Sequence, residues 1–413
     1  MDVAMALAVL FFCLLLLSSA AITFLLLRHC LSGLRRRHRA AAAADVDAEA
    51  AEGGAGARQL MPPCSPPPQQ ELPLLRPAAK LVPSTKEEGE PWKLTWREVE
   101  ALTGGFDEAA VVGRGGSSTV YLASSCRVAV VSPPVAVKVH RWCGGERWLR
   151  AFRQELDLLR RLRHPHIVSL LAYSDDHGTR HSPLSYYSNC LNYYLSGGTL
   201  ADRLHGGASP PLPWRHRMRV VHDVAGALEH LHDGAPPVVH GDVSASNVLL
   251  DGRGLGARLC DLGSACEGFS AAVAPTRAAV GSPGYVDPFF LRTGIVSKKS
   301  DVYSFGVLLL EAITGSPAAG IPGPDGGAGG GNLTARLLPR VRTEGVDGLA
   351  DRRLGDDYDA AEAGDVARIA VECLAAQPGL RPTMAQVRAA IAEKAATSIS
   401  IAHHDLHDAS DST

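Results

Sequence analysis

The longest apolar stretch of the chain lies at its amino terminus. Residues 3–27 carry no charge, and the polar side chains that interrupt them are Ser18, Ser19 and Thr23. At about 1.5 Å per residue, a helix of about 25 residues is longer than the roughly 30 Å hydrocarbon core of a bilayer. A cleaved signal peptide is the alternative, but its apolar region is shorter and follows positive charge, whereas this run follows Asp2. The pattern therefore predicts one transmembrane helix over residues 3–27.

Positive charge follows this apolar run and does not precede it. The arginines after it are Arg28, Arg35, Arg36, Arg37 and Arg39. Because the positive flank of a membrane helix stays in the cytosol, the rest of the chain is expected there and residues 1–2 on the opposite side. The sequence thus predicts a single-pass protein, expected at the plasma membrane, without a sensing ectodomain.

Small and polar residues dominate residues 28–91. A basic start is followed by alanine runs, glycine and a proline-rich stretch at 62–68, a composition that cannot bury a core. We expect a disordered juxtamembrane linker. Regular patterning resumes at residues 94–102, where Thr95 and Glu98 form a capping-box pattern before an amphipathic helix.

Strand and helix periodicities then follow one another. Residues 135–139 alternate as a strand that carries one cation, Lys138. Residues 152–162 have helical periodicity, and Glu155 lies beside their apolar seam. That seam is formed by Phe152, Leu156, Leu159 and Leu162. Taken alone, Lys138 is an ordinary surface lysine and Glu155 a solvated acid, but an inward-facing Glu155 would pair with Lys138.

A glycine-rich segment precedes this strand. Residues 112–121 contain Gly113 and Gly115, whose spacing lets backbone amides approach phosphate groups. Val120 would then cover a nucleotide base. A glycine loop alone is weak evidence, and its position just before the strand with Lys138 gives it weight.

A polar turn lies between two apolar segments further along the chain. Residues 238–250 present Asp242 and Asn247 between flanks that are typical of short buried strands. Asp261 follows, fourteen residues after Asn247, in the sequence Asp-Leu-Gly. By itself the turn is also consistent with an ordinary hairpin.

Taken in this order, these segments resemble the eukaryotic protein kinase family, and within it the plant receptor-like kinases and the related Pelle and interleukin-receptor-associated kinases. The similarity runs from about Trp92 to about Glu393. Further matching segments are 164–168, 195–200, 281–285, 300–306 and 380–384. The resemblance implies an α+β, bilobal kinase fold with a small β-rich lobe and a larger, mostly helical lobe. It places the kinase domain at 92–394, followed by a polar, disordered tail at 395–413.

The resemblance also assigns roles within the site. It makes Asp242 the catalytic base, Lys138 and Glu155 an ion pair, and Asn247 and Asp261 the ligands of the Mg²⁺, or Mn²⁺, that accompanies ATP. The residues expected to bind the nucleotide are Gly113, Arg114, Gly115, Gly116, Ser117, Ser118, Val120, Ala136, Lys138, Tyr193, Leu195, Asn247 and Asp261. Asn192 aligns with the residue that guards the deep pocket beside the adenine.

Three positions, Phe289, Asp301 and Arg381, bear on the stability of the lower lobe. Asp301 resembles the family's buried acid that supports the catalytic loop from below, and an N-cap role shared with Ser300 is a compatible local alternative. Phe289 stands where the family has a glutamate that pairs with the arginine aligned with Arg381. We therefore expect Arg381 to need another acceptor and the lower lobe to lose stability.

The catalytic loop itself departs from the family at two positions. Gly241 replaces the arginine that binds a phosphate on the activation segment, so the sequence resembles kinases called non-RD, without strict dependence on that switch. Ser244 replaces a lysine that steadies the transferring phosphate. Because charge stabilisation is the main catalytic resource in this chemistry, Ser244 predicts slower transfer.

The resemblance implies a membrane-anchored serine/threonine kinase that transfers the γ-phosphate of ATP to protein hydroxyls in receptor-associated signalling. Its expected partners are protein substrates and a co-receptor or receptor kinase. The alternative is a weakly active or inactive pseudokinase scaffold, but the lysine, acids and metal ligands of an active site are all present. A formal net charge of -2 does not indicate a nucleic-acid partner, and nine cysteines without paired metal spacing suit a reducing cytosol.

Overall fold

The computed structural model describes a folded region that begins at Pro91. The described residues are 91–115, 118–123, 134–141, 146–175, 187–206, 211–252, 256–268, 281–320, 331–344 and 348–410. The predicted transmembrane helix at 3–27, residues 1–2 and the linker at 28–91 lie outside them, apart from Pro91 itself. Within the described ranges, no helix has the length and apolar character needed to cross a bilayer.

The first part of this region is built on a six-stranded sheet with the strand order β1-β5-β6-β4-β3-β2. Its strands are β1 (Trp92–Lys93), β2 (Val111–Arg114), β3 (Ser118–Leu122), β4 (Val135–Arg141), β5 (Leu170–Ser174) and β6 (Tyr187–Tyr193). Neighbouring strands are antiparallel except for β1, which runs parallel to β5 at one edge. The predicted strand over residues 135–139 is confirmed as the first five residues of β4, which lies between β3 and β6 and carries Lys138.

Helix α2 (Trp96–Leu102) closes one side of the small core of this lobe. The predicted capping box is confirmed, because Thr95 and Glu98 bond each other's backbone amides. Phe106 has a left-handed backbone (φ 63°) and stacks on Trp96 with ring centroids 4.8 Å apart. The buried residues of this core are Leu94, Val99, Tyr121, Val137, Val139, Ala172 and Leu191. The segment between β1 and β2 thus contributes Leu94 and Val99 to the core of this lobe.

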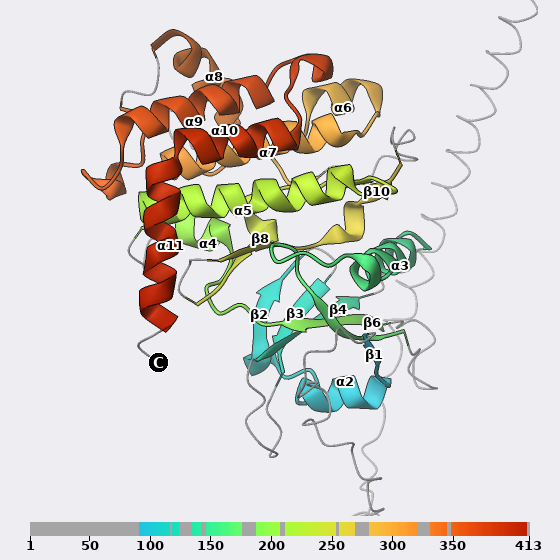
Figure 1. The fold of residues 1–413 in the computed structure, drawn as a ribbon. Helices are drawn as coiled ribbons and strands as arrows, with labels where there is room; N and C mark the ends of the chain where they lie inside the picture. Colours follow the sequence, from blue (N-terminus) through green and yellow to red (C-terminus); the bar gives the residue numbers. More distant parts are fainter. Residues whose placement is uncertain are drawn as a thin grey trace, which may run out of the picture. The chain divides into compact units, whose positions relative to one another are not determined.

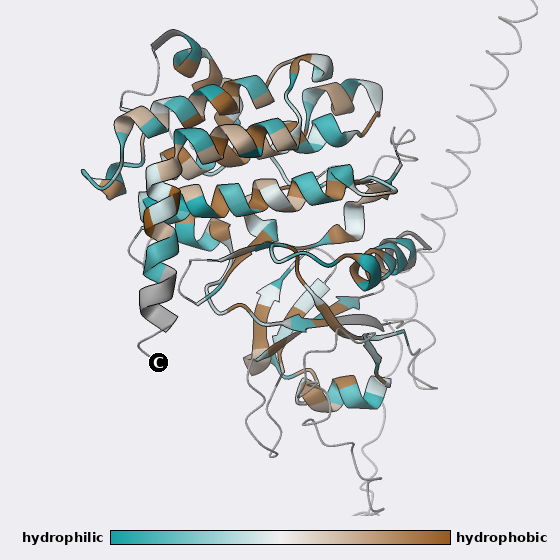
Figure 2. Cartoon of the chain, viewed as in Figure 1, coloured by the Kyte–Doolittle hydropathy of each residue, from teal (hydrophilic) through white to brown (hydrophobic). Residues whose placement is uncertain are grey.

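Helix α3 (Glu146–Arg161) has the amphipathic character expected of residues 152–162. Phe152, Leu156 and Leu159 are buried, and Leu162 is half-buried just after the helix ends. The opposite face exposes Arg150, Arg153 and Arg160, and hydrophilic residues colour most of the visible surface of α3 in Figure 2. Glu155 is buried with the apolar seam and is not a solvated acid.

The second part is mostly helical, as Figure 1 shows, so the α+β, two-lobed architecture expected from the sequence is confirmed. Its helices are α4 (Leu200–His205), α5 (Trp214–Asp233), α6 (Pro288–Thr293), α7 (Lys298–Thr314), α8 (Leu333–Glu344), α9 (Ala360–Cys373), α10 (Met384–Lys394) and α11 (Ala396–Ser410). Short 3₁₀ segments are η2 (Glu108–Ala110) in the first lobe and η3 (Ala245–Asn247), η4 (Leu262–Ser264), η5 (Arg352–Leu354) and η6 (Pro378–Leu380) in the second.

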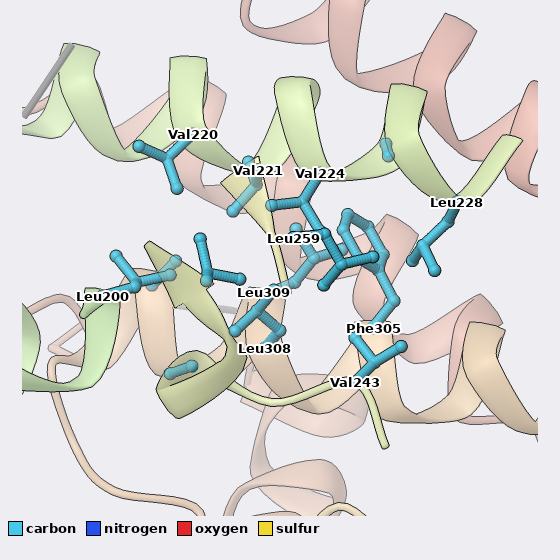
Figure 3. Close-up of a cluster of buried hydrophobic side chains, with 14 of the residues drawn as sticks. Leu200, Val220, Val221, Val224, Leu228, Val243, Leu259, Phe305, Leu308 and Leu309 are labelled. Carbon is cyan, nitrogen blue, oxygen red and sulfur yellow. The ribbon is translucent and has the colours of Figure 1, made fainter. Parts of the chain in front are cut away.

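Helices α5 and α7 form the centre of the second lobe. Figure 3 shows apolar side chains of both helices gathered in one cluster with Val243 of the catalytic loop. The labelled residues are Val220, Val221, Val224 and Leu228 of α5, Phe305, Leu308 and Leu309 of α7, and Leu200, Val243 and Leu259. Val243 belongs to the loop between Asp242 and Asn247, so burial of its side chain anchors that loop to the core.

The apolar flanks of the polar turn are strands, but the hairpin alternative for them is wrong. Strand β7 (Val238–Val239) pairs with β10 (Cys266–Glu267), and β8 (Val248–Leu250) pairs with β9 (Ala257–Leu259). Because each flank has a separate antiparallel partner, the turn is fixed from two directions.

The prediction of a disordered tail at 395–413 is wrong for most of its length. Helix α11 covers residues 396–410 and packs on α5. Ile399 and Ala402, three residues apart, are buried on one face, and Arg215 of α5 lies 2.8 Å from the Asp405 carboxylate. The sequence of the tail has a polar composition because serines, histidines and aspartates separate the few residues that form this narrow apolar face. Residues 411–413 lie outside the described residues.

Two partly buried histidines near Arg388 predict loss of stability in acid. Burial and the nearby charge of His230, on which its ring stacks at 4.8 Å, lower the pKa of His164 to about 4. Burial and Arg388 lower the pKa of His222 to about 4. The unfolded chain takes up these protons first, near pH 6.5, so stability is retained above about pH 6.5 and falls toward pH 4.

Thermal unfolding followed from pH 7 to pH 4.5 checks this expectation. Replacing His164 and His222 with phenylalanine should flatten the decline in melting temperature, whereas His404→Phe, at an exposed position, should leave it unchanged. Parallel curves for all three proteins would show that other groups control the acid response.

Candidate active site

Lys138 and Glu155 form a buried ion pair between β4 and α3. The lysine Nζ lies 2.9 Å and 3.1 Å from the two carboxylate oxygens, and the side chains are 15% and 3% exposed. Burial raises the pKa of Glu155, but the charges of Lys138 and His140 and the hydrogen bonds from both side chains together lower it to about 2. The pair is therefore charged at neutral pH, and Lys138 is not an ordinary surface lysine.

Asp261, a residue of the second lobe, also pairs with Lys138. Its Oδ1 lies 2.9 Å from Lys138 Nζ, and burial is again outweighed by the two acids, which raise the pKa of Lys138. Asp261 has a left-handed backbone (φ 65°), a conformation that costs an L-residue roughly 1–2 kcal/mol but that aspartate tolerates better than most. The turn that begins η4 thereby aims the carboxylate back toward β4.

Asp242 and Asn247 are held together within the catalytic loop. The Asn247 side-chain amide donates to the Asp242 carbonyl at 2.8 Å and to its carboxylate at 3.2 Å. The backbone N–H of Cys260 donates to the Asn247 carbonyl at 2.9 Å, which sets Asn247 beside the residue that precedes Asp261. The structure thus brings Lys138, Glu155, Asp242, Asn247 and Asp261 into one site.

Asp301 supports this loop from α7. Its carboxylate accepts the backbone N–H groups of His240 at 2.7 Å and Gly241 at 2.9 Å, and His232 Nε2 lies 2.8 Å away. The alternative of an N-cap shared with Ser300 is wrong, because Ser297 is the N-cap and Asp301 lies a turn inside the helix, fully buried.

The glycine-rich segment connects β2 and β3. Gly113 and Arg114 end β2, and the Gly115 N–H donates to the Ser118 carbonyl at 2.8 Å as β3 begins. Val120 of β3 is paired with Lys138 of β4 in the register of the sheet. Gly116 and Ser117, also expected to bind the nucleotide, lie outside the described residues. The described part forms an antiparallel turn directly beside the lysine.

The connection after β6 lies beside the same strands. Ala136 pairs with Asn192 across β4 and β6, and the Tyr194 N–H donates to the Pro134 carbonyl at 2.7 Å. Leu195 follows and is half-buried. The side chain of Tyr193 lies outside the described residues, although its backbone is the last in β6. Asn192 is the penultimate residue of β6, and its role beside a deep pocket stays a prediction.

The backbone conformation at position 241 favours glycine. Its φ is 79°, and a Cβ added there would lie 2.6 Å from the carbonyl oxygen of Ser264. A side chain at this position therefore meets both backbone strain and a steric clash. Sequence comparison with the family suggests only the lost charge, whereas the structure shows that the local backbone favours glycine.

Ser244 is fully buried, and its Oγ has no hydrogen-bond partner among the described residues. The site has thus lost a cation and contains an unsatisfied hydroxyl in its place.

We expect Ser244→Lys to raise turnover. Added positive charge beside the developing anion should increase kcat about tenfold, with little change in ATP affinity, because the charge acts mainly in the transition state. Ser246→Lys is the matched control, since it adds the same charge at an exposed position of the same loop. Steady-state kinetics on folded proteins test the prediction, and equal rates for the wild type and Ser244→Lys would contradict it.

The expected loss of a partner for Arg381 is wrong. Asp287, two residues before Phe289, accepts from the guanidinium at 2.7 Å and 2.8 Å, and both side chains are almost completely buried. The acid that pairs with Arg381 therefore lies two residues earlier in the chain than the family's glutamate. Sequence inspection missed it because only the position of the family's glutamate was considered.

Sequence reasoning also missed how the segment that begins at Gly281 contacts the catalytic loop. The Ser282 N–H and hydroxyl donate to Asp242 Oδ1 at 2.7 Å and 2.8 Å. Tyr285 accepts the Ala245 N–H at 2.9 Å and donates to buried Glu311, whose pKa burial raises to about 8. A small cavity of about 40 Å³ is lined by residues of the catalytic loop, of this segment and of α7, among them Asp242, Ser282 and Asp301. The repeated glycines and Tyr285 in residues 281–285 were the available signal.

Among the described residues, no group of three or more histidine, cysteine, aspartate or glutamate side chains could hold a metal ion by itself. The candidate ligand atoms are a carboxylate oxygen of Asp261 and the side-chain amide oxygen of Asn247. The two residues are connected through Cys260, which precedes Asp261 and is hydrogen-bonded to Asn247. Mg²⁺ is usually bound by one or two such groups together with substrate phosphates and water, so this donor set fits a metal that arrives with a nucleotide.

Comparison with known families matches residues 106–390 to the protein kinase domain. This range contains every site residue named above. It begins within the packed region formed with α2 and ends in α10, so α11 lies beyond it.

Curated relatives are similar over most of the folded region. The chain is 48% identical over 313 residues to the salt tolerance receptor-like cytoplasmic kinase 1 of Oryza sativa subsp. japonica, covering 73% of this chain and 80% of the relative. It is 36% identical over 322 residues to a probable receptor-like protein kinase of Arabidopsis thaliana, covering 74% and 89%. An EPD1-interacting receptor-like cytoplasmic serine/threonine-protein kinase of Nicotiana benthamiana is 35% identical over 301 residues, with 71% and 62% covered.

Proposed function

Because the chain belongs to the protein kinase family, among the plant receptor-like kinases, we propose that it is a membrane-anchored serine/threonine kinase in receptor-associated signalling. Its class of reaction is the transfer of phosphate from ATP to protein hydroxyls, with a divalent metal. The observation that carries the proposal is the closed set of contacts from Glu155 through Lys138 to Asp261, beside Asp242 and Asn247.

The roles proposed for these residues follow from their chemistry. Lys138 is charged and held in place, and it positions the α- and β-phosphates of ATP. The Asp242 carboxylate orients the substrate hydroxyl and accepts its proton as phosphate transfer proceeds. Its contact with Ser282 involves only Oδ1, and Oδ2 faces the Asn247 amide. Residues 113–118 cover the phosphates, and Ala136, Val120, Tyr193 and Leu195 surround the base.

We propose Mg²⁺ as the metal, held by Asp261 and Asn247. When bound, it neutralises charge on the phosphates during transfer. Asp261 uses Oδ1 for Lys138, which leaves Oδ2 for a ligand bond, and its side chain is 43% exposed. Mn²⁺ has similar preferences for oxygen ligands and is the expected substitute.

Anchoring in the membrane is proposed from residues 3–27 and the arginines that follow them. Two relatives named above are described as cytoplasmic kinases, so this part rests on the chain's own sequence. An upstream receptor kinase or co-receptor is the proposed source of the stimulus, because the relatives are named as receptor-like kinases. The plasma membrane is the proposed location.

A scaffold function is the second candidate. The buried Ser244 hydroxyl, in a position where the family has a lysine, favours slow transfer. The scaffold would keep the fold and bind partners without significant turnover.

One experiment tests both parts of the proposal. The full chain is synthesised into sealed microsomes, and radiolabelled ATP, Mg²⁺ and protease are applied from outside in separate reactions. We expect phosphate on the wild-type protein and at least about 10²-fold less on Lys138→Met, because the phosphates lose their fixed cation. Lys394→Met, at an exposed position, is the control. Protease should remove the kinase domain and leave the amino-terminal segment in the membrane.

The outcomes separate the candidates. Equal labelling of wild type and Lys138→Met would favour the scaffold. Release of the whole chain by alkaline carbonate would contradict the anchor, and protection of the kinase domain from protease would contradict its cytosolic orientation.

A further inference from the structure

The segment 281–287 connects the catalytic loop to the core of the second lobe. Near its start, Ser282 donates twice to the Asp242 carboxylate. In its middle, Tyr285 is bonded to Ala245 and Glu311. At its end, Asp287 is bonded to Arg381. A shift of the last contact would therefore be passed, over five residues, to the acid that orients the substrate hydroxyl.

Asp287 makes an unusually complete set of contacts. Both oxygens accept from the Arg381 guanidinium, at 2.7 Å and 2.8 Å, and Oδ1 also accepts the Phe289 N–H at 2.9 Å as the N-cap of α6. One carboxylate thus fixes the start of a helix and pairs with a distant arginine. Its side chain is 1% exposed, so water does not compete for these bonds.

Arg381 is held equally firmly. Its remaining N–H groups donate to the carbonyls of Ala375 at 2.8 Å and Lys299 at 2.7 Å, and its guanidinium lies 5.1 Å from the centre of the Tyr303 ring. A bidentate, buried pair of this kind sets orientation as well as distance. Arg381 therefore provides a rigid reference point for whatever carboxylate meets it.

We infer that Asp287 is a positioning residue for protein substrates. It takes over, from two residues earlier in the chain, the structural role that the family resemblance gives to an acid at position 289. Its carboxylate holds the end of segment 281–287, so that Ser282 and the surface around it meet the catalytic acid in one arrangement. The proposed nucleotide contacts are made by Lys138 and Asp261, which bond each other at 2.9 Å, so ATP binding is not expected to depend on Asp287.

Steric considerations explain why the acid sits at 287. The residue at 287 has an extended backbone just before α6, and its side chain points into the buried space beside Arg381. Phe289 lies within the first turn of α6 and is half-buried. A glutamate at 289 has one more methylene than aspartate, which suits an approach to the same arginine from the helix.

The test uses the full chain and three variants, Asp287→Asn, Phe289→Glu, and the double variant. Asn at 287 keeps the shape and the cap but loses the charge that matches Arg381. We expect the KM for casein to rise about tenfold in Asp287→Asn, as for other small displacements near a reacting group, while the KM for ATP stays within about twofold. Phe289→Glu alone should change neither constant, and the double variant should recover most of the lost affinity for casein.

The difference between the two KM values separates positioning from general stability, because a general distortion of the fold would weaken the binding of ATP and casein together. An unchanged KM for casein in Asp287→Asn, or no recovery in the double variant, would overturn the inference. If Asp287→Asn fails to fold, folding of the double variant supports exchange of the two acids, and its failure refutes it. This inference rests on the proposed role of Asp242, and lack of transfer by the wild-type chain would instead contradict the proposed function.

Discussion

Asp242→Asn is expected to lower kcat about 10²–10⁴-fold while ATP affinity stays within about twofold, because the change removes a proton acceptor and leaves the shape of the loop. Asparagine can still accept the Ser282 N–H through its oxygen, and the Asn247 amide still bonds the main-chain carbonyl of residue 242. Asp301 continues to hold the preceding backbone. Nucleotide titration and single-turnover transfer of labelled phosphate, measured on the same preparation, separate the two effects.

Asp233→Asn makes the same chemical change at an exposed position near the end of α5 and should have no effect on either measurement. Lys138→Met should differ in kind, because it removes the cation proposed to bind the phosphates and so weakens nucleotide binding. If Asp242→Asn retained more than about a tenth of the wild-type kcat, general-base catalysis by Asp242 would be ruled out as the main contribution.

Local patterns in the sequence were sufficient where each element depends on its own residues. Alternation over residues 135–139 predicts β4, and the apolar seam over 152–162 predicts most of α3. The Thr95 capping box is a contact between residues three apart and is read directly from the sequence. Periodicity alone does not show that Lys138 meets Glu155. The family resemblance implies that pair, and the structure places the Lys138 Nζ 2.9 Å from a carboxylate oxygen of Glu155.

Contacts between residues far apart in the chain could not be predicted in the same way. Arg381 and Asp287 are separated by 94 positions, and nothing in the local sequence marks Asp287 as more than a helix cap. The clash that favours Gly241 involves the carbonyl of Ser264, whose position depends on the turn after Asp261. Departures from a family pattern indicate where compensation is needed, but only the folded arrangement shows which residue provides it.

Helix α11 illustrates a weaker local signal. Its apolar face is narrow and its hydroxyl and acidic side chains become buried or paired only by contact with other helices. Ser398 donates to Glu362, which also accepts from the Trp214 indole at 2.9 Å. A polar composition is therefore a poor guide to disorder where a helix docks through hydrogen bonds. The packing of α11 on α5 extends the second lobe past the range matched to the kinase family.

Asp301→Ala is expected to have the largest effect on stability. The change leaves the buried N–H groups of His240 and Gly241 and the ring of His232 without their acceptor. Each orphaned group costs about 1–3 kcal/mol, so we expect a loss of about 3–5 kcal/mol in unfolding free energy. The catalytic loop loses its support from α7, and a displacement of about 1 Å at Asp242 would reduce kcat about 10²-fold even in molecules that remain folded.

Chemical denaturation and activity at low temperature distinguish these two consequences. Asp301→Asn keeps one carbonyl oxygen that can accept the His240 or Gly241 N–H, so both its stability and its kcat should fall between those of the wild type and Asp301→Ala. Asp202→Ala is a control of a different kind, because it removes an exposed helix-capping acid and should cost only about 1 kcal/mol without a specific loss of kcat. Wild-type kcat in folded Asp301→Ala would mean that the loop keeps its geometry without this carboxylate, since Ala245 and Val243 would then suffice to anchor it through Tyr285 and the apolar core.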